Sequence, residues 1–164
     1  MAVGLNEPGD ISAVAGIELA SLSAGIKKNG KDDLVILVFD ESSSCAATFT
    51  LNAFCAAPVT LAKQHLSSAS PRALLINSGN ANAGTGDIGM QNAVHSCELL
   101  AEKLNCSPAQ VLPFSTGVIG EQLPMDKLQS GIDTIVDLLS VDNWLSAAQG
   151  VMTTATSAKA VTKE

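Results

Sequence analysis

The sequence contains few aromatic and few charged residues. Among its 164 residues there is no tyrosine, aromatic side chains make up 3%, and charged side chains make up 15%. The hydrophobic fraction of 46% is too high for a disordered chain. A chain of this length can bury a sizeable core, which must be built from Ala, Val, Leu and Ile. We therefore expect residues 1–164 to form a single domain.

A basic stripe is also missing. The net charge is −7, and of the nine Lys and Arg residues only Lys27, Lys28 and Lys31 lie close together in the sequence. Nucleic-acid binding requires such a stripe, preferably with aromatic side chains that stack on bases. The composition therefore argues against nucleic acid as a partner, and the acidity is attributed to solubility.

Signals for membranes, export and metals are missing as well. No apolar run approaches the ~20 residues that cross a bilayer, so no membrane partner is expected. The first ten residues contain neither the basic nor the apolar region of a signal peptide. The four cysteines form no C-x-x-C pair, which argues against a zinc or redox site. The expectation is a cytoplasmic protein with reduced, mostly buried thiols and no bound metal.

The sequence does contain alternating strand-like and helix-like segments. Apolar, β-branched runs predict strands at 34–39 and 73–76, and composition adds one at 44–51. We further expect a strand or strand pair within 1–32 and helices from Pro58, from Ile88 to Leu104, from Pro124 to Leu139, and from about Asp142. The expected apolar face of the second helix carries Ile88, Val94, Leu99, Leu100 and Leu104. This order predicts an α/β or α+β fold with mixed sheets layered with helices.

Residues 77–86, NSGNANAGTG, have the most unusual composition in the chain. They include three Asn and three Gly and no apolar residue larger than Ala. Gly and Asn tolerate positive φ angles and close backbone approaches, so this segment predicts a tightly constrained loop. Two roles remain open for it: a structural loop that packs beside a site, or a loop that contacts a ligand directly.

Residues 111–120, VLPFSTGVIG, carry the strongest chemical signal. A buried strand is expected to open at Ser115-Thr116-Gly117, where a hydroxyl and bare amide N–H groups can stabilise an anion. The alternative is an ordinary turn at the end of a strand. Ser115 is a poor nucleophile candidate because the G-x-S-x-G pattern is missing.

Other reactive side chains are better explained by packing. His65 and His95 lie on expected helices without ligand partners at suitable spacing, which favours partly exposed helix histidines. Cys97 and Cys106 lie neither at a glycine turn nor beside a basic partner, so buried thiols are expected.

Four segments together resemble the ornithine acetyltransferase family, the bifunctional glutamate N-acetyltransferases of arginine biosynthesis. They are FTLNAFCAAPV (49–59), LLINSGNANAGTGDIG (74–89), VLPFSTGVIGEQLP (111–124) and VMTTATSAK (151–159). These segments occur in the order of the family and at similar spacing, so the resemblance covers essentially the whole chain.

The resemblance implies an acetyltransferase with an N-terminal-nucleophile-like fold. Family members are made as one precursor that cleaves itself before a threonine, which then accepts acetyl from N-acetylornithine and passes it to glutamate in a ping-pong scheme. Thr116 and Gly117 correspond to the oxyanion hole, and Thr153 corresponds to a residue that contacts the amino-acid substrate. No cofactor is implied, although acetyl-CoA can serve as a co-substrate of bifunctional members. A heterotetramer is the assembly implied by the family.

The nucleophilic threonine of the family follows a Lys-Gly-Ala-Gly stretch that has no counterpart before Glu164. The expectation is therefore an N-terminal, α-chain-like portion that needs a complementary C-terminal (β) chain and is inactive alone. Ala155 and Ala158 stand where the family usually has aspartate and proline, which is a departure close to Thr153. Thr153 also has the alternative role of a capping or strand threonine.

Two other functions remain open at this point. The chain could belong to an N-terminal-nucleophile aminopeptidase, a relative that uses the same nucleophile on a different substrate. It could also be a non-enzymatic module that holds a ligand at the anion-binding turn.

Overall fold

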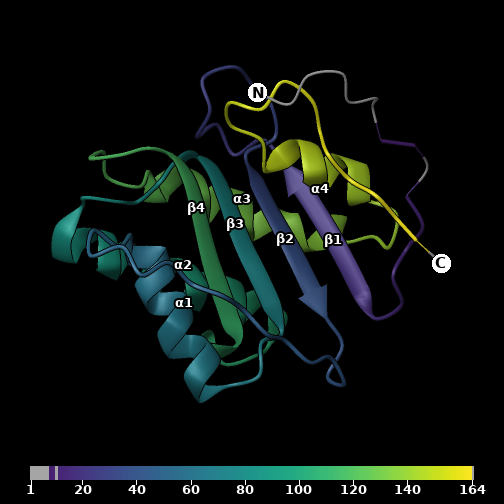
Figure 1. The fold of residues 1–164 in the computed structure, drawn as a ribbon, viewed down its shortest axis with the longest axis horizontal. Coiled ribbons are helices and arrows are strands. Elements are labelled where there is room, and N and C mark those ends of the chain that lie inside the picture. The colour runs from purple at the N-terminus through teal and green to yellow at the C-terminus, as the bar shows by residue number, and fades with distance from the viewer. Residues whose placement is uncertain (1–7, 10, 164) are drawn as a thin grey trace.

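The computed structural model describes residues 8, 9 and 11–163, and within them the strands form one four-stranded mixed sheet in the order β1-β2-β3-β4 (Figure 1). β1–β2 and β2–β3 are antiparallel, whereas β3–β4 is parallel. The parallel pair needs a crossover, which a long helix supplies. The strands are β1 (Ile17–Leu22), β2 (Leu34–Phe39), β3 (Ala73–Asn80) and β4 (Val111–Val118).

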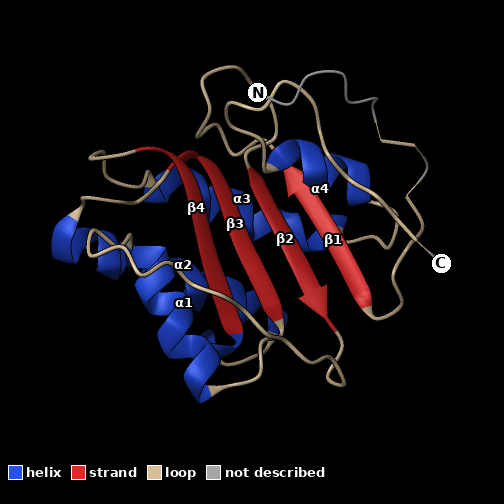
Figure 2. Cartoon of the chain, in the orientation of Figure 1, coloured by secondary structure: helices blue, strands red, loops and turns tan. Residues whose placement is uncertain are grey.

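Helices cover the two faces of the sheet unequally (Figure 2). The larger core joins α1, α2 and α3 to one face, where Leu34 and Ile36 are fully buried. A smaller core joins α4 to the other face through Leu19, Val35 and Ala147. No helix in the described ranges is long and apolar enough to cross a membrane. The helical elements are α1 (Ala57–Ser68), α2 (Gly86–Leu104), the 3-10 turn η1 (Pro108–Gln110), α3 (Met125–Ile135), the 3-10 turn η2 (Val136–Leu138) and α4 (Trp144–Gly150).

Most of the expected elements are confirmed. The strand predicted at 34–39 is β2 with the same bounds, and the predicted opening strand is β1. Helix α1 has proline in its first turn, where the missing N–H costs no hydrogen bond. Asn105 ends α2 in the left-handed conformation, with φ 51°. The expected α/β class with a mixed sheet and packed helices is therefore confirmed.

Three expectations about elements are wrong. Residues 44–51 form an exposed loop, with Leu51 fully exposed, because no strand lies beside them to accept their hydrogen bonds. β3 continues through Asn77–Asn80, so the first part of the 77–86 segment is strand and not loop. The helix from Pro124 ends as α-helix at Ile135 and tightens into η2 before Leu139.

The buried face of α2 differs from the prediction at one residue and includes small residues that the prediction left out. Ile88 is 56% exposed, whereas Gly89, Ala93 and Cys97 are buried, together with Leu100. Gly89 leaves room for the Thr85 and Asn82 side chains at the start of α2, because a Cβ added at Gly89 would collide with the Thr85 hydroxyl. Val94, Leu99 and Leu104 also pack against the larger core, so the predicted face is confirmed except at Ile88.

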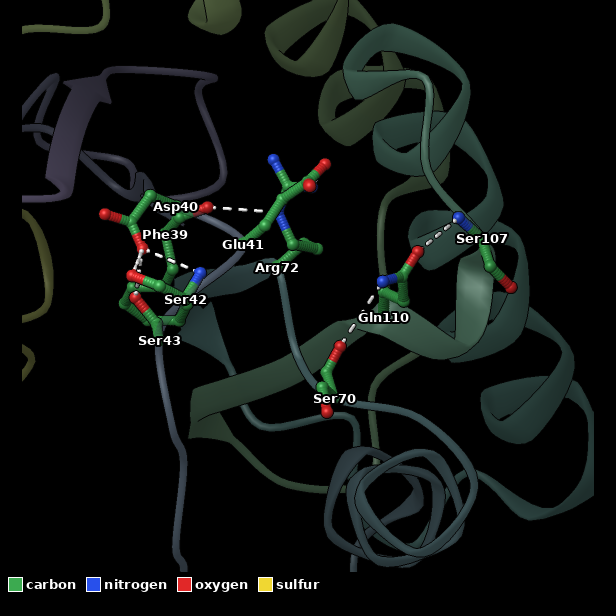
Figure 3. A network of polar contacts seen from close by, with 9 residues as sticks. All are labelled: Phe39, Asp40, Glu41, Ser42, Ser43, Ser70, Arg72, Ser107 and Gln110. Carbon is green, nitrogen blue, oxygen red and sulfur yellow. Dashed lines mark hydrogen bonds and ion pairs between the residues drawn. The ribbon is translucent and has the colours of Figure 1, made fainter.

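A polar network closes the end of the sheet at which β2 ends and β3 begins (Figure 3). The Arg72 side chain donates to the Phe39 carbonyl at 3.1 Å and pairs with Glu41 at 3.0 Å. Hydroxyl groups of Ser42 and Ser43 donate to Asp40 and hold the pKa of that carboxyl below its usual value. The opposite end of the sheet, where β3 and β4 both finish, carries the predicted site.

Candidate functional site

The Ser115-Thr116-Gly117 segment lies near the end of β4, pressed against the end of β3. Gly117 is the register partner of Gly79, and the register between the strands shifts just after this pair. With φ +139°, Gly117 occupies a backbone conformation that favours glycine. A Cβ added there would collide with the Gly79 carbonyl carbon and lie 2.6 Å from the Asn80 nitrogen. The strand end therefore depends on two glycines in direct backbone contact.

The hydroxyl groups of Ser115 and Thr116 have different environments. Ser115 donates to the side-chain oxygen of Asn77 at 2.6 Å, so it is engaged in holding β4 to β3. This contact gives Ser115 a structural role and agrees with its being a poor nucleophile candidate. The half-buried Thr116 hydroxyl makes no hydrogen bond to any residue that the structure describes. Of these two neighbouring hydroxyl groups, Thr116 is the one that remains available to a ligand.

The asparagines of the 77–86 segment point inward. Asn77, Asn80 and Asn82 are at most 4% exposed. Asn77 donates to the Asn80 carbonyl, Asn80 donates to the Glu121 and Gln122 carbonyls, and Asn82 donates to the Gly89 carbonyl. Because these amides are consumed by internal hydrogen bonds, the geometry favours the structural role for this segment over direct ligand contact.

Thr153 is exposed and lies three residues beyond the end of α4. It lines a cavity of about 460 Å³, together with Lys27, Lys31, Asp32, Gln149 and Met152. Of the two departures from the family pattern, Ala155 is exposed and lines the cavity, and Ala158 is buried at its wall. Thr153 makes no side-chain hydrogen bond within the described ranges, so neither capping nor strand pairing accounts for its hydroxyl.

The two predicted parts of the site lie at the same end of the sheet. Ser78 is the register partner of Thr116, and its hydroxyl donates to the Gly150 carbonyl at 2.5 Å. Gly150 ends α4 and leads directly into the segment that contains Thr153. Among the described residues, no hydrogen bond joins Thr153 to Thr116 or Gly117. The structure therefore brings these parts to one end of the sheet without direct contact between them.

Lys27 is a site residue that the sequence reasoning missed. Its ammonium group donates to the Asp32 carbonyl at 2.7 Å and to the Gly150 carbonyl at 3.1 Å. Burial lowers the pKa of Lys27, and the nearby Asp33 and Asp32 carboxylates oppose that shift. In the sequence, Lys27 stood out only as one of three lysines that lie close together. The signal that could have indicated its role is the acidic pair Asp32-Asp33 directly before β2, whose carboxylates lie near the Lys27 ammonium group.

The two histidines lie as expected, but the expectation of mostly buried thiols is wrong: Cys97 is buried, Cys55 and Cys106 are half-buried, and Cys45 is exposed. His65 donates to the Val111 carbonyl at 2.7 Å, and the exposed His95 lies 3.3 Å from Glu98. Burial raises the pKa of Cys97 to about 12 and also raises the pKa of Cys106, so both thiols stay protonated at neutral pH. In the described ranges, every cysteine is free and no group of three or more His, Cys, Asp or Glu is placed to hold a metal.

Comparison with known proteins places these features in a family context. Residues 18–164 match the ArgJ family. The chain is 50% identical over 164 residues to the arginine biosynthesis bifunctional protein ArgJ of Pseudomonas syringae pv. tomato, covering all of this chain and 40% of that protein. It is 51% identical over 146 residues to the protein of the same name from Methylococcus capsulatus, covering 89% of this chain and 36% of the relative. The chain thus spans less than half the length of these relatives.

Two solved structures share the fold. The ornithine acetyltransferase of Mycobacterium tuberculosis, solved in complex with ornithine, has a TM-score of 0.84 and 35% identity, over 90% of this chain and 80% of that chain. The arginine biosynthesis bifunctional protein argJ of Bacillus halodurans has a TM-score of 0.82 and 30% identity, over 90% of this chain and 78% of that chain. At these identities, the likeness includes sequence as well as fold.

Proposed function

The chain belongs to the ArgJ family, and from this premise we propose that it is the N-terminal, α-chain-like portion of an ornithine acetyltransferase. The complete enzyme moves an acetyl group from N-acetylornithine to glutamate in arginine biosynthesis. This portion supplies the oxyanion hole, Thr116 and Gly117, and one substrate contact, Thr153. A complementary C-terminal (β) segment supplies the nucleophilic threonine.

The observation that carries the proposal is the free Thr116 hydroxyl on a fixed strand end. The Ser115–Asn77 hydrogen bond and the Gly117–Gly79 contact hold the backbone on both sides of Thr116. An oxyanion hole needs donors that are already in place, because reorganising them during the reaction would cancel much of their benefit. A free donor between two anchored neighbours meets that requirement.

The chemistry follows from the charge that develops in each half-reaction. The nucleophilic threonine oxygen bonds to the acetyl carbon of N-acetylornithine, its proton passes to the N-terminal amine, and the carbonyl oxygen becomes an oxyanion. Collapse breaks the C–N bond, returns that proton to the departing ornithine amine and leaves an acetyl ester on the threonine. The glutamate amine then attacks the ester through a second oxyanion. Thr116 and Gly117 stabilise the negative charge both times.

The proposal extends to partners and location. The assembly is a heterotetramer of α- and β-type chains, and the enzyme acts in the cytoplasm without a bound cofactor. Acetyl-CoA is a further acetyl donor to be tested. That trait depends on the complete substrate site, of which this chain supplies a part.

The test is a chimaera in which residues 1–164 are joined to the part of the Pseudomonas syringae relative that this chain does not cover. This relative is chosen because it is 50% identical to the chain over all 164 residues. Purified chimaera is assayed for acetyl transfer from N-acetylornithine to glutamate, with acetyl-CoA tested separately as donor. Residues 1–164 alone serve as the control.

We expect the chimaera to transfer acetyl and residues 1–164 alone to be inactive. Initial rates at several concentrations of both substrates should give parallel double-reciprocal lines, as an acetyl-enzyme scheme requires. A folded chimaera without acetyl transfer would contradict the proposal. Acetyl release to water in place of transfer to glutamate would instead support an aminopeptidase-like hydrolase.

A further inference from the structure

The carbonyl of Gly150 accepts two side-chain hydrogen bonds. The Ser78 hydroxyl of β3 donates to it at 2.5 Å, and the Lys27 ammonium group donates at 3.1 Å. This carbonyl is at the C-terminal end of α4, where the helix dipole places partial negative charge and a lysine is favourable. Two side chains from distant parts of the sequence therefore fix one point on the chain.

Both donors are themselves held in place. Ser78 is 1% exposed and belongs to an interior strand of the sheet. The loop that carries Lys27 is held by the fully buried Asp33 carboxylate, which accepts from the Ala24 and Lys27 backbone amides at 2.7 Å each. The Lys27 ammonium group also donates to the Asp32 carbonyl at 2.7 Å.

Gly150 is pressed onto the sheet at this point. A Cβ added to Gly150 would lie 2.5 Å from a methyl group of Val35. The chain then leaves the sheet through residues 151–153, where the Val151 amide still donates to the Ala147 carbonyl at 3.1 Å and the Met152 amide to the Gln149 carbonyl at 3.2 Å. Among the described residues, the Gly150 carbonyl is thus the last point before Thr153 that side chains from β3 and from the Lys27 loop hold directly.

We propose that Ser78 and Lys27 are positioning residues that act through the Gly150 carbonyl to set the place of Thr153 relative to Thr116. The proposal rests on the function proposed above. Ser78 and Thr116 are register partners on the adjacent strands β3 and β4. The hydrogen bond from Ser78 to Gly150 therefore fixes the start of the 151–153 segment relative to Thr116. Lys27 lines the same cavity as Thr153 and holds the segment through the same carbonyl.

The two parts of the site should respond differently to substitution. Thr116 acts on charge that exists only in the transition state, so its loss lowers kcat. Thr153 contacts the amino-acid substrate already in the bound state, so its displacement weakens binding and raises KM. A positioning role for Ser78 and Lys27 therefore predicts a KM effect.

The experiment uses the active chimaera with Ser78→Ala, Lys27→Met and the double substitution. Ser96→Ala is the matched control for serine, because Ser96 is also buried and donates to a backbone carbonyl, that of Ala93, but on α2. Lys28→Met is the control for lysine, because Lys28 is an exposed neighbour. Lys27→Arg tests rescue by a side chain that keeps the charge. Steady-state rates and thermal midpoints are measured for every variant.

We expect Ser78→Ala and Lys27→Met each to raise the KM for glutamate by about 10-fold, with kcat reduced by less than about 3-fold. Because both side chains act on one carbonyl, the double variant should show less than the product of the single effects. Lys27→Arg should recover most of the affinity, and both controls should leave KM unchanged. Thermal midpoints should not follow the KM values.

An unchanged KM in both single variants of an active chimaera overturns the inference while leaving the proposed function intact. A KM that rises in proportion to the loss of thermal stability, in the controls as well, also overturns it, because the residues would then act only on the fold. An inactive unsubstituted chimaera contradicts the proposed function itself. These outcomes are distinguishable in a single set of proteins.

Discussion

Thr116 and Ser115 are adjacent hydroxyl residues that face opposite sides of β4, because side chains alternate along a strand. Ser115 faces the larger core and donates to Asn77, whereas Thr116 lies on the face that α4 covers in part, with its hydroxyl free. The Ser115 hydroxyl therefore stabilises the pairing of β3 and β4, whereas the Thr116 hydroxyl remains available for the proposed oxyanion hole.

Substitutions of Thr116 and Ser115 should have opposite effects on turnover and on stability. In the chimaera, Thr116→Ala should lower kcat by about 10²–10³-fold, since one oxyanion donor is lost. It should change stability little, since that hydroxyl has no partner among the described residues. Ser115→Ala should do the reverse, costing about 1–2 kcal/mol of stability because the part-buried Asn77 oxygen loses its donor. Steady-state kinetics and thermal unfolding test both, and unchanged turnover in Thr116→Ala would remove its assignment.

Gly117 and Gly120 test the backbone contact at the end of β4. Both have positive φ, but a Cβ at Gly117 meets Gly79, whereas at Gly120 nothing lies within 4 Å. Gly120→Ala should therefore cost about 1 kcal/mol for the backbone conformation alone. Gly117→Ala should cost at least about 2 kcal/mol more, because the strands must separate. Urea midpoints of the two variants measure the difference, and equal midpoints would argue against the contact.

Cys97 predicts a pH dependence of stability. Burial raises the pKa of this thiol from 9.0 to about 12 in the folded chain. Above pH 9 the unfolded thiol releases its proton while the folded one keeps it, so unfolding becomes more favourable as pH rises. The contribution is about 1.4 kcal/mol per pH unit until the folded pKa is reached.

Urea unfolding from pH 8 to pH 11 measures this slope. Cys97→Ala should lose stability at pH 8 through the cavity left behind, and should show a shallower decline with pH. Equal slopes in the two proteins would contradict the assignment. Below pH 9, we expect the Cys97 thiol to resist alkylation in the folded chain, whereas the exposed Cys45 should react.

Among the elements, α2 ends on a single unusual residue. Asn105 has φ 51°, and its amide donates to the Ala101 and Glu102 carbonyls. Asn105→Gly should keep or raise stability by up to about 1 kcal/mol, because glycine adopts this conformation without steric cost. Asn105→Val should lower it by about 1–2 kcal/mol, since branched residues avoid the left-handed region. Thermal midpoints of the two variants measure this difference. Equal midpoints would contradict the left-handed C-cap conformation of Asn105.

Predictability from sequence also differed between elements. β2 was predicted correctly from its continuous apolar run, because a strand covered on both faces of the sheet needs apolar side chains on both faces. The 44–51 segment has similar strand composition but lies in a loop, because a strand also needs a neighbour, which composition does not encode. β3 extends through Asn77–Asn80 because their polar side chains find partners as distant as residues 121 and 122. A prediction from a short stretch of sequence cannot include partners that are so far along the chain.

The candidate site was also only partly predictable from the sequence. The residue types identified Thr116 and Gly117, but β4 does not open at 115–117 as expected, because it stays paired with β3 through Val118. The contact of Gly117 with Gly79 was not predicted. Lys27 was not recognisable, because its contact with Gly150 spans 123 residues and its burial differs from that of the exposed Lys28 and Lys31. Short-range patterns identify chemistry that a segment carries itself, and they miss side chains recruited from elsewhere.

In the whole molecule, one patch of the sheet is incompletely covered. Leu37, Leu74 and Ile76 are half-buried and Phe114 is 41% exposed, on the face that α4 covers only in part. These residues are register neighbours across β2, β3 and β4. The residues Leu51, Phe54 and Ile119 add further exposed apolar surface.

We therefore expect residues 1–164 alone to self-associate and to bind a hydrophobic dye, because contiguous apolar surface of this kind is unfavourable in water. The chimaera should bind less dye per chain, since the added segment would cover part of this surface. Size-exclusion chromatography and dye fluorescence provide the measurement. A monomeric, dye-free protein would contradict the expectation.

The contacts at the Gly150 carbonyl have a consequence for the order in which the protein assembles. They join residues that are 72 and 123 positions apart, whereas the β1–β2 pair joins segments separated by a short connection. Closing a long loop costs more chain entropy, so distant contacts form after local ones have shortened the effective loop. The sheet and its helices can then be largely folded before Thr153 reaches its place. The ability to hold substrate would be acquired last, at the end of the folding reaction.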